Sequence, residues 1–292
     1  MPTHIAVDIG VTKHNFPITV IICTLNEEKN IRECIVSVQS NRPSEIIVVD
    51  GGSTDRTVEC AKRFPVRVIE TSKGLGNQTQ VGIDDASQDY IALIHADDRC
   101  ADRCLETLMQ EIQTAGYWAI MAQTLSLEPR TYWERAMDIN LKLINRVGPT
   151  NMVGRPALFK REAFRIVRND PVFTFSAEDT DLSRQMELAG LSQGHGTGIV
   201  YRKHLATMGA CFRQWKRYGE GDGRFVYKYP SRMPRVLFHL LIHYPIIKSL
   251  RAAWLGSGRY CGFFVMQGCV RTMWAVKEYL SLVFSRGLRL WT

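Results

Sequence analysis

Apolar strands alternate with amphipathic helices through the first third of the chain, and this pattern restricts the fold more than any other feature. Apolar runs occupy residues 18–23, 45–50 and 90–94, a short strand is expected over 67–70, and residues 30–39 carry apolar side chains at helical spacing. Runs rich in Val, Ile and Leu are typical of strands that are buried on both faces of a parallel sheet. The pattern predicts an α/β fold, with a Rossmann-like, mostly parallel sheet and helices on both faces.

Polar and acidic residues follow the predicted strands directly. They occupy residues 24–27, 50–55 and 95–98. A helix cap or a β-to-α turn explains each of these motifs when it is taken alone. Ligands of open α/β sheets, however, bind just beyond the carboxyl ends of the strands. We call these polar segments at the carboxyl ends of the strands the strand exits. Three strand exits in succession therefore predict one binding site.

A further acidic cluster, at residues 178–181, precedes a helix that we expect over 182–189. Carboxylates at a helix N-terminus are favourable by themselves, because they oppose the helix dipole. Together with the three preceding polar motifs, however, their order and spacing favour a functional role. The residues alone leave both interpretations open.

Charge is distributed unevenly along the chain. The net charge is +8, yet residues 201–292 carry 16 Lys or Arg and three acidic residues, a balance of +13. Such an excess indicates an anionic partner: a membrane surface, a diphosphate or nucleic acid. We expect no nucleic acid, because aliphatic residues interrupt the basic ones throughout.

The eight cysteines form neither a disulfide framework nor a paired zinc motif, so we expect reduced thiols. Residues 1–16 are interpreted as an N-terminal arm without the apolar core of a secretory signal. A cytoplasmic location follows as the expectation.

The C-terminal region, residues 231–292, is aromatic and basic. Its apolar stretch 236–247 is too short to span a bilayer, and charges at Arg271, Lys277 and Glu278 interrupt the stretch 261–284. Helices lying in an anionic membrane interface fit this composition, which would place the protein on the inner face of the membrane. Two alternatives are packing on the catalytic domain or on a second subunit, as a homodimer, and a membrane-spanning hairpin.

Seven motifs in a fixed order resemble those of family 2 glycosyltransferases, which have the GT-A fold. They occupy residues 20–28, 47–55, 73–76, 95–98, 157–164, 177–182 and 215–219. The resemblance covers the chain to about residue 230, which divides it into an arm (1–16), a GT-A catalytic domain (17–230) and the C-terminal helical region (231–292).

The resemblance implies a role for particular residues. A divalent cation, Mg²⁺ or Mn²⁺, would be held by Asp97 and Asp98, with Asp98 the more direct ligand. Asp179 would be the catalytic base, beside Glu178. Nucleotide binding would fall to Asp50 at the base, to Asp97, and to Thr24, Asn26, Glu27, Lys73, Arg213, Trp215, Arg217 and Tyr218.

Two departures from the family pattern refine the expected activity. His95 replaces the first Asp of the usual Asp-x-Asp motif, and the Gln-x-x-Arg-Trp motif of processive synthases is absent. We therefore expect single transfers, with inversion, from a nucleotide-sugar, UDP-sugar favoured. The acceptor would be a hydroxyl group, lipid-linked or polysaccharide-related. The alternatives are a non-catalytic carbohydrate or membrane adaptor and a sugar-nucleotide pyrophosphorylase, which would carry a basic glycine-rich loop after its first strand.

Overall fold

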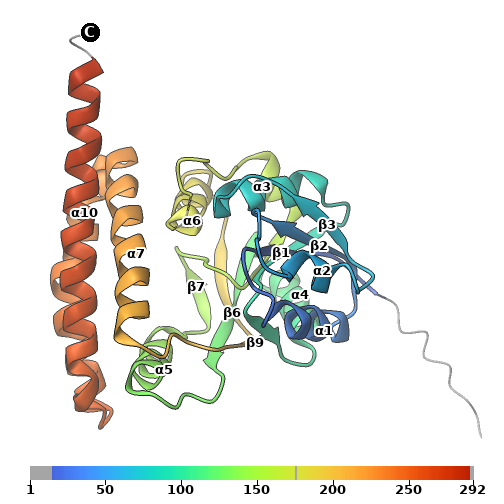
Figure 1. The fold of residues 1–292 in the computed structure, drawn as a ribbon, viewed down its shortest axis with the longest axis horizontal. Helices are drawn as coiled ribbons and strands as arrows, with labels where there is room; N and C mark the ends of the chain where they lie inside the picture. The colour runs from blue at the N-terminus through green and yellow to red at the C-terminus, as the bar shows by residue number, and fades with distance from the viewer. Residues whose placement is uncertain (1–14, 175, 290–292) are drawn as a thin grey trace, which may run out of the picture.

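One mixed sheet forms the centre of the protein. The computed structural model describes residues 15–174 and 176–289 (Figure 1), so most of the predicted N-terminal arm, residues 1–14, lies outside the described ranges. Within these ranges the strands run in the order β3-β2-β1-β4-β8-β6-β9-β5, with β7 beside β9. Their bounds are β1 Phe16–Thr24, β2 Pro43–Asp50, β3 Arg67–Glu70, β4 Tyr90–His95, β5 Asp98–Cys100, β6 Ala119–Ser126, β7 Gly148–Thr150, β8 Ala157–Lys160 and β9 Gln193–Arg202.

The first half of the sheet is parallel, as the sequence predicts. Strands β3, β2, β1 and β4 all run the same way, with Thr24 opposite Asp50 and Cys23 opposite His95. The polar strand exits therefore lie at one edge. The second half is mixed, because β8 runs antiparallel to both β4 and β6. Strand β9, which the sequence pattern did not predict, pairs with β6, β7 and β5.

Helices cover both faces of the sheet, which explains the uninterrupted apolar strands. Successive residues of a strand point to opposite faces. Val20 and Ile22 accordingly lie in one core, whereas Ile21 and Cys23 lie in the other. The first core is closed by α1 (Ile31–Ser40), α2 (Thr57–Ala61) and α4 (Cys104–Thr114), and the second by α3 (Leu75–Asp85), the 3₁₀ helix η1 (Arg161–Arg165) and α6 (Glu178–Leu188).

Two helices do not begin directly after the polar segments that precede them. Residues 98–100 belong to β5, and α4 begins at Cys104. Helix α2 begins at Thr57, because Ser53 and Thr54 are hydrogen-bonded to Asp50 and Asn26 and do not cap it. The spacing of apolar residues along the sequence does not reveal these contacts, because some of them join distant parts of the chain.

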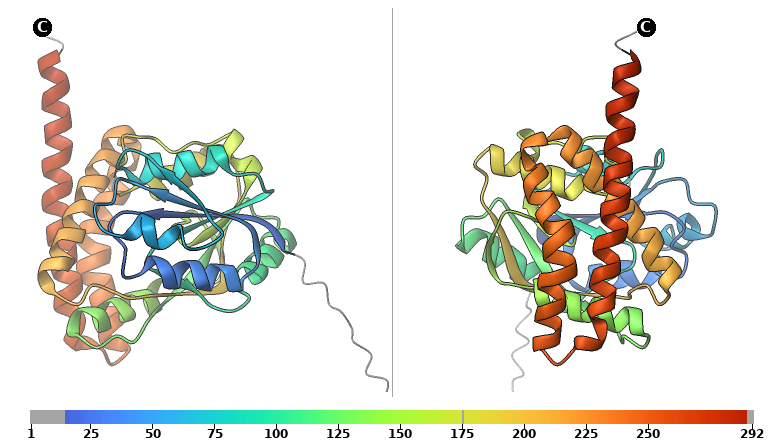
Figure 2. Two further views of the ribbon diagram at one scale, coloured as in Figure 1. Left: turned by 45° about the vertical axis from the view of Figure 1, so that its right-hand side comes forward. Right: turned by 90° about the vertical axis from the view of Figure 1, so that its left-hand side faces the viewer.

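The C-terminal region is a layer of helices at one side of the sheet domain (Figures 1 and 2). Helix α5 (Tyr132–Ile144) and the long α7 (Met208–Lys228) connect it to the sheet domain. After α7 come the 3₁₀ helix η2 (Pro230–Arg232), α8 (Met233–Phe238), the π-helix η3 (His239–Lys248), α9 (Ser249–Trp254), the 3₁₀ turn η4 (Gly258–Tyr260) and α10 (Cys261–Arg289).

Helix α10 packs along α7, and two glycines make the close approach possible. A Cβ atom at Gly219 would lie 2.5 Å from the carbonyl oxygen of Arg271, and one at Gly223 would lie 2.5 Å from that of Ala275. Distances this short exclude any side chain at either position. The four-residue spacing puts both glycines on the face of α7 that meets α10.

The described part of the C-terminal region thus packs on the catalytic domain, one of the alternatives left open by the sequence. None of the helices between residues 15 and 289 combines the length and the apolarity that crossing a membrane requires. Contact with a membrane interface and dimerisation both stay predictions.

Candidate active site

A cavity of about 630 Å³ opens between the strand exits, the N-terminus of α6 and the C-terminal helices. We call it the pocket. Its lining residues come from three parts of the chain that are distant in sequence. They include Glu27 and Asp97 after two strands, Glu178 and Asp179 on α6, and Arg217, Tyr218, Arg235 and Arg271 from α7, α8 and α10.

Glu27 and Asp97 form the acidic side of the pocket at the strand exits. Burial raises the pKa of Glu27, and the charge of Asp97 adds to this effect. Burial likewise raises the pKa of Asp97. Desolvation and a neighbouring negative charge destabilise the ionised form of each carboxylate, and a bound cation would stabilise it. This arrangement favours a divalent ion between the protein and an anionic ligand.

Asp98 does not face the pocket as a free ligand. Both of its carboxylate oxygens accept from Arg202, at 2.7 and 2.9 Å, and one also accepts the backbone N–H of His95 at 3.0 Å. Asp98 is completely buried, whereas Asp97 is partly exposed and lines the pocket. This geometry disagrees with the expectation that Asp98 is the more direct metal ligand, because its oxygens already accept hydrogen bonds, and it favours Asp97 as the residue available to a ligand.

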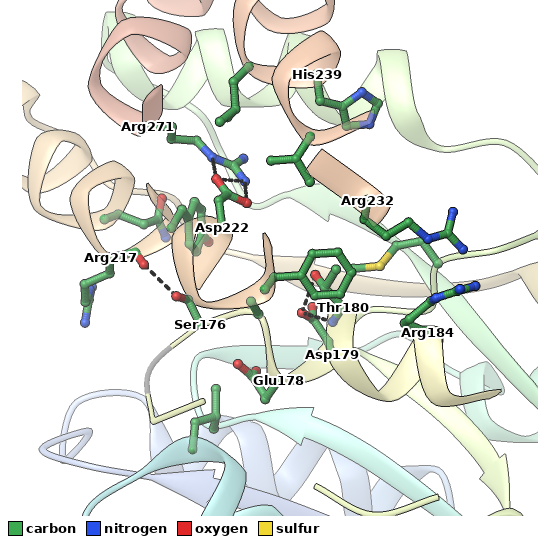
Figure 3. Close-up of a pocket in the computed structure, with 18 of the residues that line it drawn as sticks. Ser176, Glu178, Asp179, Thr180, Arg184, Arg217, Asp222, Arg232, His239 and Arg271 are labelled. Carbon is green, nitrogen blue, oxygen red and sulfur yellow. Dashed lines mark hydrogen bonds and ion pairs between the residues drawn. The ribbon is translucent and has the colours of Figure 1, made fainter. Parts of the chain in front are cut away.

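Glu178 and Asp179 enter the pocket from the first turn of α6 (Figure 3). Burial, and then the charge of Asp179, raise the pKa of Glu178 to about 7. Its Oε2 atom is buried without a hydrogen-bond partner among the described residues. Burial also raises the pKa of Asp179, although Thr180 donates its backbone N–H to Oδ1 at 2.7 Å. Desolvated carboxylates that face a cavity are typical of acid–base sites.

The nucleoside side of the predicted site is a network of turns. The carboxylate of Asp50 accepts from the backbone N–H groups of Gly52 and Ser53, at 2.9 and 2.8 Å. Asn26 joins this turn to the end of β1, because its backbone donates to the Ser53 hydroxyl at 2.8 Å. Thr24 is buried nearby, and its hydroxyl lacks a partner within the described residues.

Neither Asp50 nor Thr24 lines the pocket, so the structure brings only part of the predicted nucleotide site into it. Glu27 and Asp97 are in the pocket, and Asn26 is exposed beside the turn. Lys73 is exposed on the loop before α3 and does not line the pocket.

Helix α7 also contributes only part of what the sequence predicts. Arg217 and Tyr218 line the pocket, and their contact with a nucleotide stays a prediction. Arg213 lies on the exposed surface outside it. Trp215 has no exposed surface, and its ring packs against Trp133 and Phe263 in the core of the C-terminal region. The expectation that Trp215 contacts the nucleotide is therefore wrong: its apolar bulk holds α5, α7 and α10 together.

Several residues that shape the site had no clear signal in the sequence. Gln78 is buried and donates to the backbone oxygens of Thr24 and Val49, which ties the first two strand exits together. Against the effect of burial, the positive charge of Arg155 lowers the pKa of both Glu178 and Asp179. A buried glutamine on an otherwise apolar helix face is a signal that could have been used, but Arg155 reaches the site only through the fold.

Gly221 sets the distance between α7 and the acidic turn. A Cβ atom at this position would overlap the hydroxyl oxygen of Ser176. That hydroxyl donates to the backbone oxygen of Arg217 at 2.5 Å (Figure 3). The glycine thus lets the helix contact the residues that precede Glu178. The alternation of glycines at 219, 221 and 223 was the available sequence signal.

The residues of the pocket suit a metal that is shared with a ligand. No group of three or more His, Cys, Asp or Glu side chains able to hold a metal alone occurs in residues 15–174 and 176–289. Mg²⁺ is commonly held by one or two carboxylates together with substrate phosphates. The hard oxygen ligands and raised pKa of Asp97 fit such a site.

Comparison of the sequence with family models gives a match in these same elements. The model of glycosyl transferase family 2 matches residues 19–172, which run from β1 to the segment before α6. This chain belongs to glycosyl transferase family 2. The match confirms the enzyme class that the motifs of the transferase predict.

Curated relatives of the transferase match it over part of its length. It is 34% identical over 105 residues to the lipopolysaccharide core biosynthesis glycosyltransferase LpsC of Rhizobium meliloti, covering 34% of this chain and 38% of that protein. It is 33% identical over 105 residues to the glycosyltransferase GlyG of Streptococcus pneumoniae, covering 33% and 35%. The matches thus span little more than a third of these relatives.

Solved structures share the fold of the transferase at low identity. A mycobacterial protein superposes with a TM-score of 0.55 at 17% identity, over 72% of this chain and 73% of that one. Residues 1–349 of S. aureus TarS superpose with a TM-score of 0.51 at 13% identity, over 92% and 91% of the chains. These likenesses bear on the fold alone.

Proposed function

We propose that the transferase moves a sugar from a nucleotide-sugar, UDP-sugar favoured, to a hydroxyl acceptor with inversion at the anomeric carbon. One observation carries the proposal: carboxylates from two strand exits and from the N-terminus of α6 converge on a single pocket. This convergence also favours an enzyme over a non-catalytic adaptor. An adaptor would gain nothing from keeping Glu178 buried with an oxygen that lacks a partner among the described residues.

The chemistry needs a base opposite the leaving group. As the acceptor hydroxyl attacks the anomeric carbon, it loses its proton to a carboxylate within hydrogen-bond reach. We assign this role to Asp179, beside Glu178, whose own pKa is raised by burial and by the charge of Asp179. A single in-line displacement inverts the anomeric configuration.

The departing nucleoside diphosphate gains negative charge in the transition state. Asp97 would hold a divalent cation, Mg²⁺ or Mn²⁺, which stabilises this charge when it is bound. Arg217 and Tyr218 line the pocket on α7 and would contact the diphosphate from the other side. Interactions that strengthen as charge develops are the ones that accelerate the reaction.

The exposed face of the C-terminal helices would hold the transferase against an anionic membrane. Leu241, Ile246, Leu250 and Trp254 are 52%, 50%, 65% and 86% exposed along η3 and α9. Apolar and aromatic side chains flanked by basic residues suit an interface in which both burial and charge contribute. This docking would bring the pocket to a lipid-linked or polysaccharide-related acceptor, on the cytoplasmic leaflet.

The decisive experiment is a turnover assay with a panel of UDP-sugars and Mn²⁺, with water as the acceptor in the absence of a better one. We expect slow release of UDP for one or a few sugars, abolished by EDTA and by Asp179→Asn. Proton NMR of the first-formed sugar gives the anomer. Release of UDP at the same rate by wild type and by Asp179→Asn would refute the assignment of the base.

A further inference from the structure

The far half of the pocket is basic and is not used by the transfer proposed above. It is formed by the middle of α6, by η2, by α8 and by η3. Its charged residues are Arg184, Glu187, Arg232 and Arg235. Figure 3 shows Arg184 and Arg232 together on one side of Asp179, while Arg217 lies on the opposite side. The pocket thus has two basic groups, with the base carboxylate between them.

The positive charge of this half is only partly neutralised. Arg184 and Arg232 share one carboxylate, that of Glu187, with Arg184 at 2.8 Å. The Nε atom of Arg184 is buried and lacks a hydrogen-bond partner within the described ranges. Arg235 is exposed at the pocket and forms no ion pair with any described residue. Three arginines and one glutamate thus line this half of the pocket, which leaves a net charge of about two and suits a phosphate.

Apolar side chains adjoin these arginines. Val236 and Leu240 line the pocket next to Arg235, and Leu237 and Leu241 are 39% and 52% exposed outside it. The basic site therefore continues into an apolar surface.

The first turns of η3 add no charge to this surface. The π-helical winding of η3 places His239, Leu240 and Tyr244 together at the pocket. His239 is exposed in part, and partial desolvation together with nearby positive groups such as His243 and Lys248 lowers its pKa, so this histidine is neutral at physiological pH. The side of the pocket formed by η3 is therefore uncharged beside the arginines.

We propose that this half of the pocket, which we call the acceptor subsite, binds a phosphate group attached to a hydrocarbon chain. The inference rests on the transfer proposed above. The phosphate lies among Arg184, Arg232 and Arg235, and the chain leaves along Val236 and Leu240. Thr180, which follows Asp179, lies on the same face of α6 as Arg184 and Glu187, and successive members of this set are about one turn apart. A sugar attached to the phosphate therefore reaches Asp179 with its hydroxyl group.

Calorimetry with dodecyl phosphate, below its critical micelle concentration, tests the acceptor subsite. The full chain is first saturated with UDP and Mn²⁺, so that the donor side is filled. We expect dodecyl phosphate to bind about tenfold more tightly than either inorganic phosphate or dodecyl maltoside, because it alone uses both the arginines and the apolar surface. Arg235→Glu should weaken this binding about tenfold or more. Arg251→Glu, an exposed arginine of α9 outside the pocket, is the matched control and should leave it unchanged.

Several results would overturn the inference. Equal affinities for dodecyl phosphate and inorganic phosphate would show that the hydrocarbon chain does not contribute to binding. Equal affinities for dodecyl phosphate and dodecyl maltoside would show that the phosphate does not contribute. Equal losses in Arg235→Glu and Arg251→Glu would show surface binding by charge. The preceding UDP titration separates this proposal from the proposed function. UDP binding without dodecyl phosphate binding refutes the acceptor subsite alone, and absent UDP binding refutes the donor site.

Discussion

Arg202 donates to both carboxylate oxygens of Asp98, from Nε at 2.7 Å and from Nη2 at 2.9 Å. The two residues are also opposite one another in the antiparallel pair of β5 and β9. Asp98 is completely buried and Arg202 is half-buried, so this ion pair is costly to break, because the remaining charge loses its partner. Asp98 thus stabilises the pairing of β5 with β9, while its neighbour Asp97 faces the pocket.

Substitution of these two aspartates should therefore have different consequences. Asp98→Ala leaves Arg202 without its partner, and we expect the free energy of unfolding to fall by about 3–5 kcal/mol. Urea denaturation measures this loss. Asp97→Asn should change stability little, yet it should abolish the Mn²⁺ dependence of UDP affinity in calorimetry. A stable Asp98→Ala protein that has lost metal-dependent UDP binding would restore Asp98 as the ligand.

The acidic pair on α6 predicts a particular pH dependence of stability. Glu178 has its pKa raised from about 4.5 to about 7 in the folded protein, so the folded state holds its proton more tightly than the unfolded chain. Stability should accordingly fall as the pH rises from about 4.5 to about 7, and stay lower above that. Glu178→Gln removes this penalty. Its stability relative to wild type should rise by on the order of 3 kcal/mol between pH 4 and pH 8, measured by denaturation at each pH.

The same pair governs the pH dependence of catalysis. The base must be ionised, so kcat/KM should rise with pH as the pair loses its protons. Glu178→Gln removes the member of the pair whose pKa burial and the charge of Asp179 raise to about 7. Any step of the profile near pH 7 should therefore disappear in this variant, and only the titration of Asp179 should remain. Asp179→Asn should be inactive at every pH while UDP affinity stays within about twofold of wild type. An inactive Glu178→Gln beside an active Asp179→Asn would exchange the two roles.

The glycines of α7 offer a test of helix packing with an internal control. Gly219→Ala and Gly223→Ala place a methyl group within 2.5 Å of backbone oxygens of α10. Each should lower the free energy of unfolding by several kcal/mol, and α10 should become sensitive to limited proteolysis. At Gly209, in the first turn of the same helix, the nearest atom would be 3.6 Å away, on the Arg213 side chain. Gly209→Ala should instead stabilise the protein by up to about 1 kcal/mol, since alanine favours the helix.

Membrane docking should depend on the exposed face of the C-terminal helices. Trp254→Glu and Leu250→Glu change side chains that are 86% and 65% exposed, so the fold should tolerate them. We expect cosedimentation with anionic liposomes to fall about tenfold or more in the double variant, and binding by wild type to weaken at high salt. Leu188→Glu, 62% exposed at the end of α6, is the control and should bind like wild type. Equal binding by all three proteins would refute docking through this face.

These experiments should use full-length variants and not a truncated protein. Trp215 is fully buried against Phe263, with α10 covering it. Removal of the chain after about residue 234 would expose this core and the glycine face of α7. The packing of α10 on α7 therefore predicts that a catalytic domain truncated at this point is unstable, because a large apolar surface would be transferred to water.

The local sequence pattern was sufficient to predict much of the fold and part of the site. The strand pattern located β1, β2, β3 and β4 to within two residues at each end. For β1, β2 and β4 the reason is that a strand buried on both faces is apolar along most of its length. The exits of these strands lie at one edge in a parallel sheet, so the convergence of Glu27 and Asp97 followed from connectivity. The sequence predicted the helix that carries the acidic cluster over 182–189, whereas α6 begins four residues earlier, at Glu178, and includes the carboxylates in its first turn.

Tertiary structure alone decided which of these polar residues are available to a ligand. Asp97 and Asp98 are adjacent and chemically identical, yet Asp98 is paired with Arg202, which lies 104 residues further along the chain. Trp215 and Tyr218 are one helical turn apart on α7, yet one faces the core beneath α10 and the other faces the pocket. A sequence specifies which side chains can bind metal or phosphate. Whether they do depends on neighbours brought close by the fold, and for this protein those neighbours lie on β9 and α10.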